Sequence, residues 1–351
     1  MTKVDHLLKQ TCEWLRGTGP NSDIVMSSRV RLARNLEGHP FSHWANKKQE
    51  KETLEKLETS VNSSEMLKGA LYVRMAEIDD VDKQFLLERH LVSREHIVHP
   101  EHKAVVIGDK EILNVMINEE DHLRIQVMQS GFNLAECWRI ASRLDDSLHK
   151  RMKFSFSNEL GYLTACPTNT GTGLRGSVML HLPSLVMTKQ ISRVLQAITK
   201  IGMTARGLYG EGTEAEGNFF QISNQVTLGR AEEDIIDELE RLIRQVIGHE
   251  ENARKTLMKQ NREMLQDKIW RANGTLKSAH IINTKETLSL LSMVRLGVDM
   301  GLISDIDRRA VNELFILTQP AHLQKIEGRV LSSAQRDVKR ANLIRRRLEG
   351  R

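Results

Sequence analysis

Arginine side chains on predicted strands and beside glycine-rich segments are the residues of this chain best suited to chemistry. Arg29 and Arg31 alternate with apolar residues over positions 27–34, so both guanidinium groups project from one face of a predicted strand. Three more arginines lie on an alternating stretch or beside a glycine-rich segment: Arg124, Arg175 and Arg206. Because guanidinium forks bind phosphate oxygens in pairs, five such groups suit a polyanion such as a triphosphate.

Two glutamates and one cysteine are candidates for acid–base and electrostatic roles. Glu120 lies in an acidic turn, Glu211 lies in the glycine-rich segment 206–217, and Cys166 directly precedes another glycine-rich segment. Spacing alone assigns no role to them, since a buried, inert cysteine is the usual case. Each arginine taken singly is also more often a solvated surface residue.

One glycine motif matches two well-known patterns and is predicted to belong to neither. Gly171, Gly173 and Gly176 fit both the dinucleotide fingerprint and the glycine loop of protein kinases. The first requires a helix directly after the glycines, whereas residues 177–182 have the pattern of a strand. The second requires VAIK, HRD and DFG segments, which the sequence lacks. The sequence also has no P-loop, CxxC or HExxH motif, so we expect no metal site built by protein ligands.

Length and composition describe an ordinary folded protein. The 351 residues suggest about two domains, and 40% hydrophobic with 28% charged residues fits a soluble fold. No apolar run approaches the roughly 20 residues of a membrane helix, so we expect no membrane association. The polar N-terminus does not resemble a signal peptide, and three widely spaced cysteines indicate a reducing, cytoplasmic location.

The net charge of +5 is concentrated near the C-terminus. Residues 329–351 contain eight basic and two acidic side chains, which leaves the remainder close to neutral. A nucleic-acid interface would use aromatic stacking platforms, and this stretch contains no aromatic residue, so we expect no direct nucleic-acid binding. A helix capped by Ser332 or Ser333 is predicted here, and a solvated basic face is its simplest interpretation.

The pattern of apolar residues predicts an α+β fold, with an antiparallel sheet and helices followed by an all-helical region. Strands are expected over 27–34, 104–107, 111–117, 122–127 and 177–182, and helices over 46–61, 134–148, 185–201 and from 231 onward. Four glycines within 206–217 predict a mobile loop. We place the domain boundary near residue 255, giving a catalytic domain over 1–255 and a helical domain over 256–351.

Four segments resemble the catalytic segments of phosphagen (guanidino) kinases in order and spacing. They are SSRVRLARN (27–35), INEEDHLRIQVM (117–128), CPTNTGTGLRGSVMLHLP (166–183) and RGLYGEGTEAEGNFFQISNQVTLG (206–229). The resemblance implies a phosphagen-kinase-like fold with ATP phosphates bound by Ser27, Arg29, Arg31, Arg124, Arg175 and Arg206. It also implies that Glu120, Glu211 and Cys166 bind and activate the guanidino acceptor, and that Mg²⁺ arrives with ATP.

Two departures indicate a particular branch of that superfamily. Only 26 residues precede Ser27, where phosphagen kinases have a helical domain that closes over a small acceptor, and a helical segment of about 95 residues follows the core. This combination resembles the bacterial protein arginine kinases, which phosphorylate arginine side chains of proteins. The segment Arg336–Ala341 matches their RDxxRA helix, which implies that Arg336, Asp337 and Arg340 bind phosphoarginine.

The same resemblance implies partners and a setting. Expected partners are protein substrates with an exposed arginine, among them a stress-gene repressor, together with a zinc-finger activator protein, a Clp ATPase and a second copy of the chain. The expected setting is the bacterial stress response and protein quality control, with allosteric regulation by phosphoarginine. A small-molecule guanidino (arginine) kinase and a binding-only adaptor remain alternatives, although an adaptor would tolerate loss of the arginines, glutamates and cysteine that this chain retains.

Overall fold

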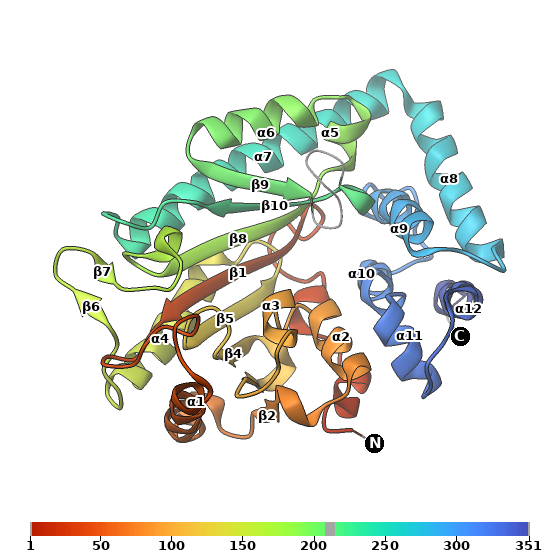
Figure 1. The fold of residues 1–351 in the computed structure, drawn as a ribbon. Coiled ribbons are helices and arrows are strands. Elements are labelled where there is room, and N and C mark those ends of the chain that lie inside the picture. The colour runs from red at the N-terminus through yellow and green to blue at the C-terminus, as the bar shows by residue number, and fades with distance from the viewer. Residues whose placement is uncertain (1, 208–214, 350–351) are drawn as a thin grey trace.

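The computed structural model describes residues 2–207 and 215–349 and has an α+β fold built on one eight-stranded sheet (Figure 1). All neighbouring strands pair antiparallel, in the order β2-β3-β4-β5-β1-β8-β10-β9. The strands are β1 (Val25–Arg34), β2 (Leu71–Arg74), β3 (Ala104–Ile107), β4 (Leu113–Ile117), β5 (Leu123–Ser130), β8 (Leu174–His181), β9 (Met203–Gly207) and β10 (Phe219–Asn224). A separate hairpin is formed by β6 (Phe156–Ser157) and β7 (Gly161–Tyr162). The predicted fold class is confirmed.

The central strand β1 brings distant arginines to one face of the sheet. Arg31 pairs with Arg175 of β8, and Ala33 pairs with Arg124 of β5. On the far side of β8, Arg206 of β9 pairs with Gln221 of β10. Because side chains alternate along a strand, the apolar residues between these arginines point to the opposite face.

That opposite face carries the main hydrophobic core. It is covered by α1 (Lys47–Asn62), α4 (Leu134–His149), α5 (Pro183–Met187), α6 (Ile191–Lys200) and the first part of α7 (Glu232–Gln260). Val30, Leu32 and Val178 are completely buried against helix residues such as Leu144 and Leu239. The helix predicted over 46–61 begins one residue later, because Asn46 is its N-cap and forms a capping box with Gln49.

Within the described residues, the arginine face is covered in two places. At the β2–β4 edge it packs against α2 (Asp80–Glu88), with Phe85 and Leu86 buried, and the short α3 (Arg94–Ile97) follows. At the other end, Met26, Met128 and Met179 join a core shared with the C-terminal helices. The part of the arginine face between these two packed regions is open to a ligand.

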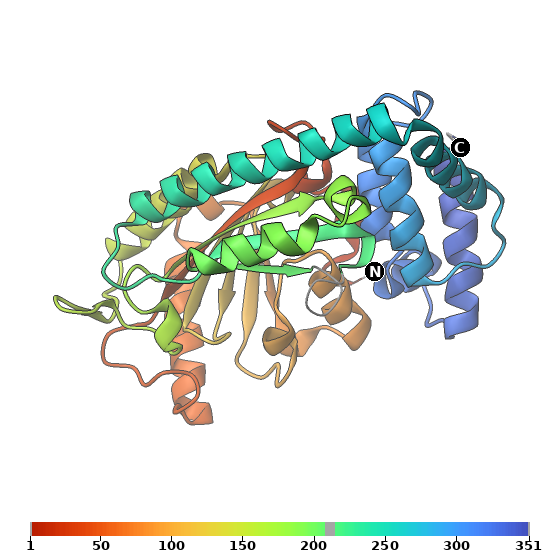
Figure 2. The ribbon, with the colours of Figure 1, turned by 90° about the horizontal axis from the view of Figure 1, so that it is seen from above.

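The C-terminal region is entirely helical, as predicted. It consists of α8 (Arg262–Ser278), α9 (Thr284–Asp299), α10 (Arg308–Leu317), α11 (Pro320–Glu327) and α12 (Ser333–Leu348). These helices gather at one end of the sheet, and α7 runs along the sheet to reach them (Figures 1 and 2). Since α7 is continuous through residue 255 and ends at Gln260, the domain division near 255 stays a prediction. In the described part of the chain, no helix combines the length and hydropathy that crossing a membrane requires.

Two predicted elements differ in detail. The single helix expected over 185–201 is two helices, because Lys189 adopts a left-handed φ of 58° and its neighbours close a Schellman-type end on α5. The loop expected from Arg206 starts later, since Arg206 and Gly207 end β9, and positions 208–214 lie outside the described residues. The glycine motif at 171–176 leads into β8 and not into a helix, which confirms that it is no dinucleotide fingerprint.

Candidate active site

The open part of the arginine face is a cavity of about 750 Å³. Its lining includes these predicted residues: Arg29, Arg31, Arg124, Arg175, Arg206, Glu120 and Cys166. These residues come from β1, β5, β8, β9 and two loops. The first and last of them, Arg29 and Arg206, are 177 positions apart in the sequence. The structure therefore brings most of the predicted ATP-binding and catalytic residues together in one cavity.

Three of the arginines have a pKa below the ordinary value of an arginine side chain. Burial, followed by repulsion from Arg175 and Arg124, lowers the pKa of Arg29 to about 10. Burial and the neighbouring guanidinium groups also lower the pKa of Arg31 and of Arg175. Within the described residues, Nε of Arg31 and Nε of Arg175 are buried without a hydrogen-bond partner. Like charges with unmatched donors are stabilised by a bound anion with several oxygens.

The partners that these arginines do have are neutral. Arg29 donates from Nη2 to Oε1 of Gln221 at 2.9 Å and from Nε to Oγ of Ser177 at 3.3 Å. Arg175 donates from Nη2 to Oγ of Ser223 at 3.3 Å. Amide and hydroxyl acceptors orient a guanidinium without neutralising it, so the positive charge remains available to a ligand.

Glu120 lies at the edge of the cavity, in the turn between β4 and β5. Its Oε2 accepts a hydrogen bond from Nη2 of Arg124 at 2.9 Å. Asp121 fixes this turn, because its Oδ1 accepts from Nδ2 of Asn35 and from the backbone N–H of Ala165, both at 2.7 Å. Burial raises the pKa of Glu120, and the charges of Asp121 and Glu119 add to that shift against the opposing effect of Arg124. A carboxylate with a raised pKa is better suited to accept a proton than an ordinary one.

Cys166 stands at the start of the short helical turn Pro167–Asn169 and lines the cavity. Its Sγ lies 3.0 Å from Oγ1 of Thr168. The other two cysteines, Cys12 and Cys137, are buried, and burial raises the pKa of both thiols. Of the three free cysteines, Cys166 is therefore the one placed for chemistry.

Ser27 is a predicted residue that the structure does not bring into the cavity. Ser27 precedes the arginines on β1 but is only 2% exposed, lies between Ser130 and Met179, and does not line the cavity. This part of β1 is covered by the core shared with the C-terminal helices. Glu211 lies outside the described residues.

Glu119 is a site residue that sequence reasoning did not single out. Its buried carboxylate accepts from Nη1 of Arg124 at 2.7 Å, from Oγ of Ser93 at 2.5 Å and from the backbone N–H of Glu120 at 2.8 Å. Its position beside Glu120 in the acidic turn was the available signal. Gln221 was also missed, because its role depends on strand register, which no local motif encodes.

The C-terminal candidates lie on α12, which Ser332 caps as predicted. Arg340 is only 1% exposed, and its donors bind the backbone oxygens of Thr318 at 2.9 Å and of Ile282 at 2.8 Å as well as the carboxylate of Asp337. Arg336 is partly exposed and donates from Nη1 to the backbone oxygen of Leu331 at 2.8 Å. Of the two arginines, Arg336 is the more accessible to a ligand.

Family models match both regions of the chain. The model described as ATP:guanido phosphotransferase, C-terminal catalytic domain, matches residues 50–253, and the model of the protein-arginine kinase McsB C-terminal domain matches residues 262–351. Among solved structures, the duplicated taurocyamine kinase from Schistosoma mansoni is 27% identical with a TM-score of 0.60, over 76% of this chain and 38% of that chain. Lombricine kinase, at 23% identity and a TM-score of 0.59 over 69% of this chain and 71% of that chain, shares the fold.

Curated relatives match nearly end to end. The protein-arginine kinase of Desulforamulus reducens is 49% identical over 339 residues, which cover 96% of this chain and 95% of the relative. The protein-arginine kinase of Halothermothrix orenii is 45% identical over 348 residues, which cover 99% of each. With an arginine-lined cavity, a carboxylate at its edge and a helical C-terminal region in place, the chain belongs to the protein-arginine kinase family of ATP:guanido phosphotransferases.

Proposed function

We propose that this protein transfers the γ-phosphoryl group of MgATP to the guanidinium groups of arginine side chains in protein substrates. The observation that carries the proposal is the cavity in which five arginines, two of them with unmatched donors, lie beside Glu120. The protein-substrate assignment, in preference to a small guanidino metabolite, rests on the relatives and on the C-terminal domain match.

The arginine cluster has the phosphate-binding role in this proposal. A transferring phosphoryl group is loose and carries its negative charge on outer oxygens, so positioned positive charge stabilises its transition state. All three of Arg29, Arg31 and Arg175 lie on strands of the sheet, and Arg29 and Arg175 are also oriented by neutral partners, so the cluster needs no rearrangement before the reaction. Mg²⁺ is proposed to enter with the nucleotide as part of the substrate.

Glu120 is proposed to accept the proton of the acceptor. A guanidinium is a poor nucleophile until it loses a proton. As the Nη–P bond forms and the P–O bond to ADP breaks, the proton on Nη passes to the Glu120 carboxylate, which leaves phosphoarginine and ADP. Glu211, assigned from the family resemblance, is proposed to orient the other side of the guanidinium, and Cys166 is proposed to stabilise it electrostatically as a thiolate.

One incubation tests this function. The protein is mixed with MgATP, free arginine and an arginine-rich protein, and acid-labile phosphate is measured on each acceptor by mass spectrometry at neutral pH. We expect phosphoarginine on the protein and little on free arginine. Phosphorylation of free arginine alone would replace the proposal with a small-molecule guanidino kinase, and no phosphoarginine on either acceptor would overturn it.

We also propose that the start of α12 binds phosphoarginine, with Arg336 facing the phosphate and with Asp337 and Arg340 shaping the site. Exposed guanidinium donors suit a phosphate, and a carboxylate suits the ligand's own guanidinium. Binding of a phosphoarginine peptide to the Arg336→Ala variant, measured by calorimetry, tests this. Unchanged affinity would remove the site.

The remaining partners are proposals that rest on family membership. They are a second copy of the chain, a zinc-finger activator, a stress-gene repressor as substrate and a Clp ATPase acting on marked proteins, in a cytoplasmic setting. Mixing the purified chain with each partner, followed by light scattering for complex formation, tests them individually.

A further inference from the structure

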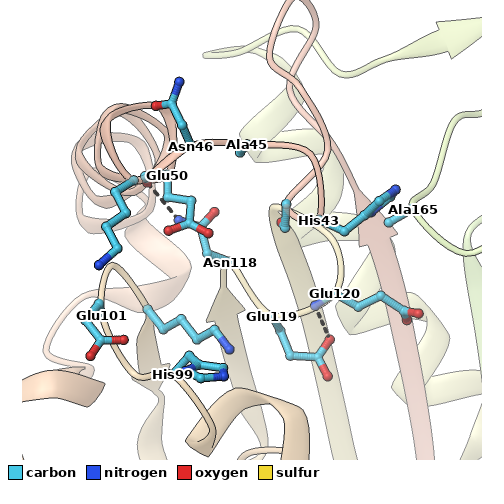
Figure 3. A pocket seen from close by; sticks show the side chains of 13 residues that line it. His43, Ala45, Asn46, Glu50, His99, Glu101, Asn118, Glu119, Glu120 and Ala165 are labelled. Atoms are coloured by element: carbon cyan, nitrogen blue, oxygen red, sulfur yellow. Dashed lines mark hydrogen bonds between the residues drawn. The ribbon is translucent and has the colours of Figure 1, made fainter.

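A second cavity of about 940 Å³ adjoins the arginine cavity. The two share Glu119 and Glu120 in their linings. The second cavity is bounded by residues of the 42–50 segment, the 99–103 loop, the acidic turn and Ala165 (Figure 3). A cavity of this size accommodates a ligand well beyond one side chain. Any arginine that reaches Glu120 from this side brings its neighbouring residues into the cavity.

The lining of this cavity is polar and rich in carboxylates. It carries four glutamates, Glu50, Glu101, Glu119 and Glu120, against two lysines, Lys47 and Lys103. Figure 3 shows Glu50 and Glu101 on the side of the cavity opposite Glu120 and Ala165.

The two outer glutamates are free to bind a ligand. Within residues 2–207 and 215–349, neither the Glu50 nor the Glu101 carboxylate forms an ion pair within 4 Å, and neither accepts a side-chain hydrogen bond. Lys103 donates from Nζ to the backbone oxygens of Glu95 and Val98, both at 2.8 Å. Burial lowers the pKa of Lys103, and Glu119, Glu50, Glu101 and Glu95 oppose that shift, which marks the region as acidic.

Two further side chains, one beside this cavity and one in its lining, are available to a ligand. Trp44 is 74% exposed, and its ring lies 4.7 Å from that of His43, which lines the cavity. Trp44 does not itself line the cavity, but its neighbours His43 and Ala45 do, so its exposed indole is available for a cation–π contact with a ligand that extends beyond the cavity. In the described structure, Oγ of Ser42 is buried without a hydrogen-bond partner, so it can bind a ligand's backbone.

We propose that this cavity binds the polypeptide segment next to the acceptor arginine and favours segments with a second cationic side chain, held by Glu50, Glu101 and Trp44. The inference rests on the proposed function, since it assigns the substrate preference of the same site. Lys47 also lines the cavity, and its charge limits the preference without cancelling it. Basic, unfolded or extended segments are thereby selected over acidic ones.

The test uses two peptides of equal length, each with one central arginine, flanked by lysines in one and by glutamines in the other. The full-length protein with MgATP is expected to phosphorylate the lysine peptide with a kcat/KM about tenfold higher at low salt, and added salt should reduce that ratio. In the double variant Glu50→Gln/Glu101→Gln the ratio should fall to about twofold. Trp44→Ala should give an intermediate ratio.

The control is Glu55→Gln, which removes one negative charge from the helix that carries Glu50, at an exposed position outside the cavity. It should keep the wild-type ratio. Equal rates for both peptides in the wild type, or an unchanged ratio in the double variant, would overturn the docking proposal while leaving arginine phosphorylation intact. Absence of phosphoarginine on both peptides would instead overturn the proposed function.

Discussion

Arg31 of the central sheet and Arg340 of α12 differ in how many of their side-chain donors have a hydrogen-bond partner. Arg31 is surrounded by other guanidinium groups, and its buried Nε has no hydrogen-bond partner within the described residues. Arg340 is more fully buried and donates to Thr318, Ile282 and Asp337. The first arrangement leaves donors for the phosphate ligand that we propose, whereas the second is already complete and holds α12 against its neighbours.

The same contrast exists within β1. Arg34 lies three residues after Arg31 and forms a buried ion pair with Asp145 at 2.7 Å, with its guanidinium 3.5 Å from the Tyr162 ring centroid. Arg31 points into the cavity and has no carboxylate within ion-pair distance in the described chain. Hydrogen-bond saturation therefore separates the structural arginines from those proposed to bind phosphate, and the saturated Arg34 and Arg340 are also the more fully buried.

The largest expected effect tests whether phosphoryl transfer in the arginine cavity requires Glu120 as a base. Glu120→Gln keeps the shape of the side chain but removes the proton acceptor, so transfer to protein arginine should fall by about 10³-fold. The affinity for MgATP should change little, because the phosphate-binding arginines remain. Stopped-flow nucleotide binding and phosphoarginine mass spectrometry measure the two properties. Glu136→Gln, at a partly exposed position of α4 outside the cavity, is the matched control, and near-wild-type transfer by Glu120→Gln would reject the assignment.

The next effect tests the contrast within β1. Arg31→Met should lower kcat/KM by about 10²-fold through the loss of phosphate stabilisation. It should leave the free energy of unfolding unchanged or higher, because a repelled, unmatched charge is removed. Arg34→Met should instead destabilise the fold by about 3–5 kcal/mol, because Asp145 is left buried without its partner. Urea unfolding and transfer assays give both values, and equal destabilisation by both variants would break the comparison.

The sequence predicted which arginines share a strand face, but it did not predict which of them have hydrogen-bond partners for all their donors. Strand alternation placed Arg29 and Arg31 on one face, and that prediction is confirmed. No local pattern could indicate that Arg34 meets Asp145 from α4, 111 positions away, or that Arg340 meets carbonyl groups from two other segments. Such partners depend on tertiary contacts, which propensity and periodicity do not encode.

The break between α5 and α6 and the burial of Ser27 were missed for related reasons. Lys189 interrupts the helix without glycine or proline, so the sequence carried no stop signal. Ser27 continues the alternation of Arg29 and Arg31, yet the core shared with the C-terminal helices covers its end of β1. Only the docking of a distant domain decides which residues of an alternating strand face remain accessible.

The pH dependence of kcat/KM tests the effect of neighbouring charges on the pKa of Glu120. Only ionised Glu120 accepts a proton, so kcat/KM falls as the pH drops through its pKa. Because burial and the neighbouring Asp121 and Glu119 raise that pKa, the acid limb should lie at higher pH than for an ordinary glutamate. Glu119→Gln removes one repelling charge, so its acid limb should move to lower pH. A limb that stays in place, measured with protein substrate well below its KM, would show that Glu119 has no influence on Glu120.

The smallest expected effect on the transfer chemistry comes from α12, and it tests the saturated half of the comparison. Arg340→Met leaves two backbone oxygens and the Asp337 carboxylate without their donor, so the free energy of unfolding should fall by about 2–4 kcal/mol. Arg336→Met removes one hydrogen bond from a partly exposed guanidinium and should cost less than about 1 kcal/mol. Phosphoarginine-peptide affinity should respond in the Arg336 variant even though its fold is intact. If Arg340→Met were as stable as the wild type, the donors of Arg340 would not be structural, and hydrogen-bond saturation would lose its value as the criterion that separates the two sets of arginines.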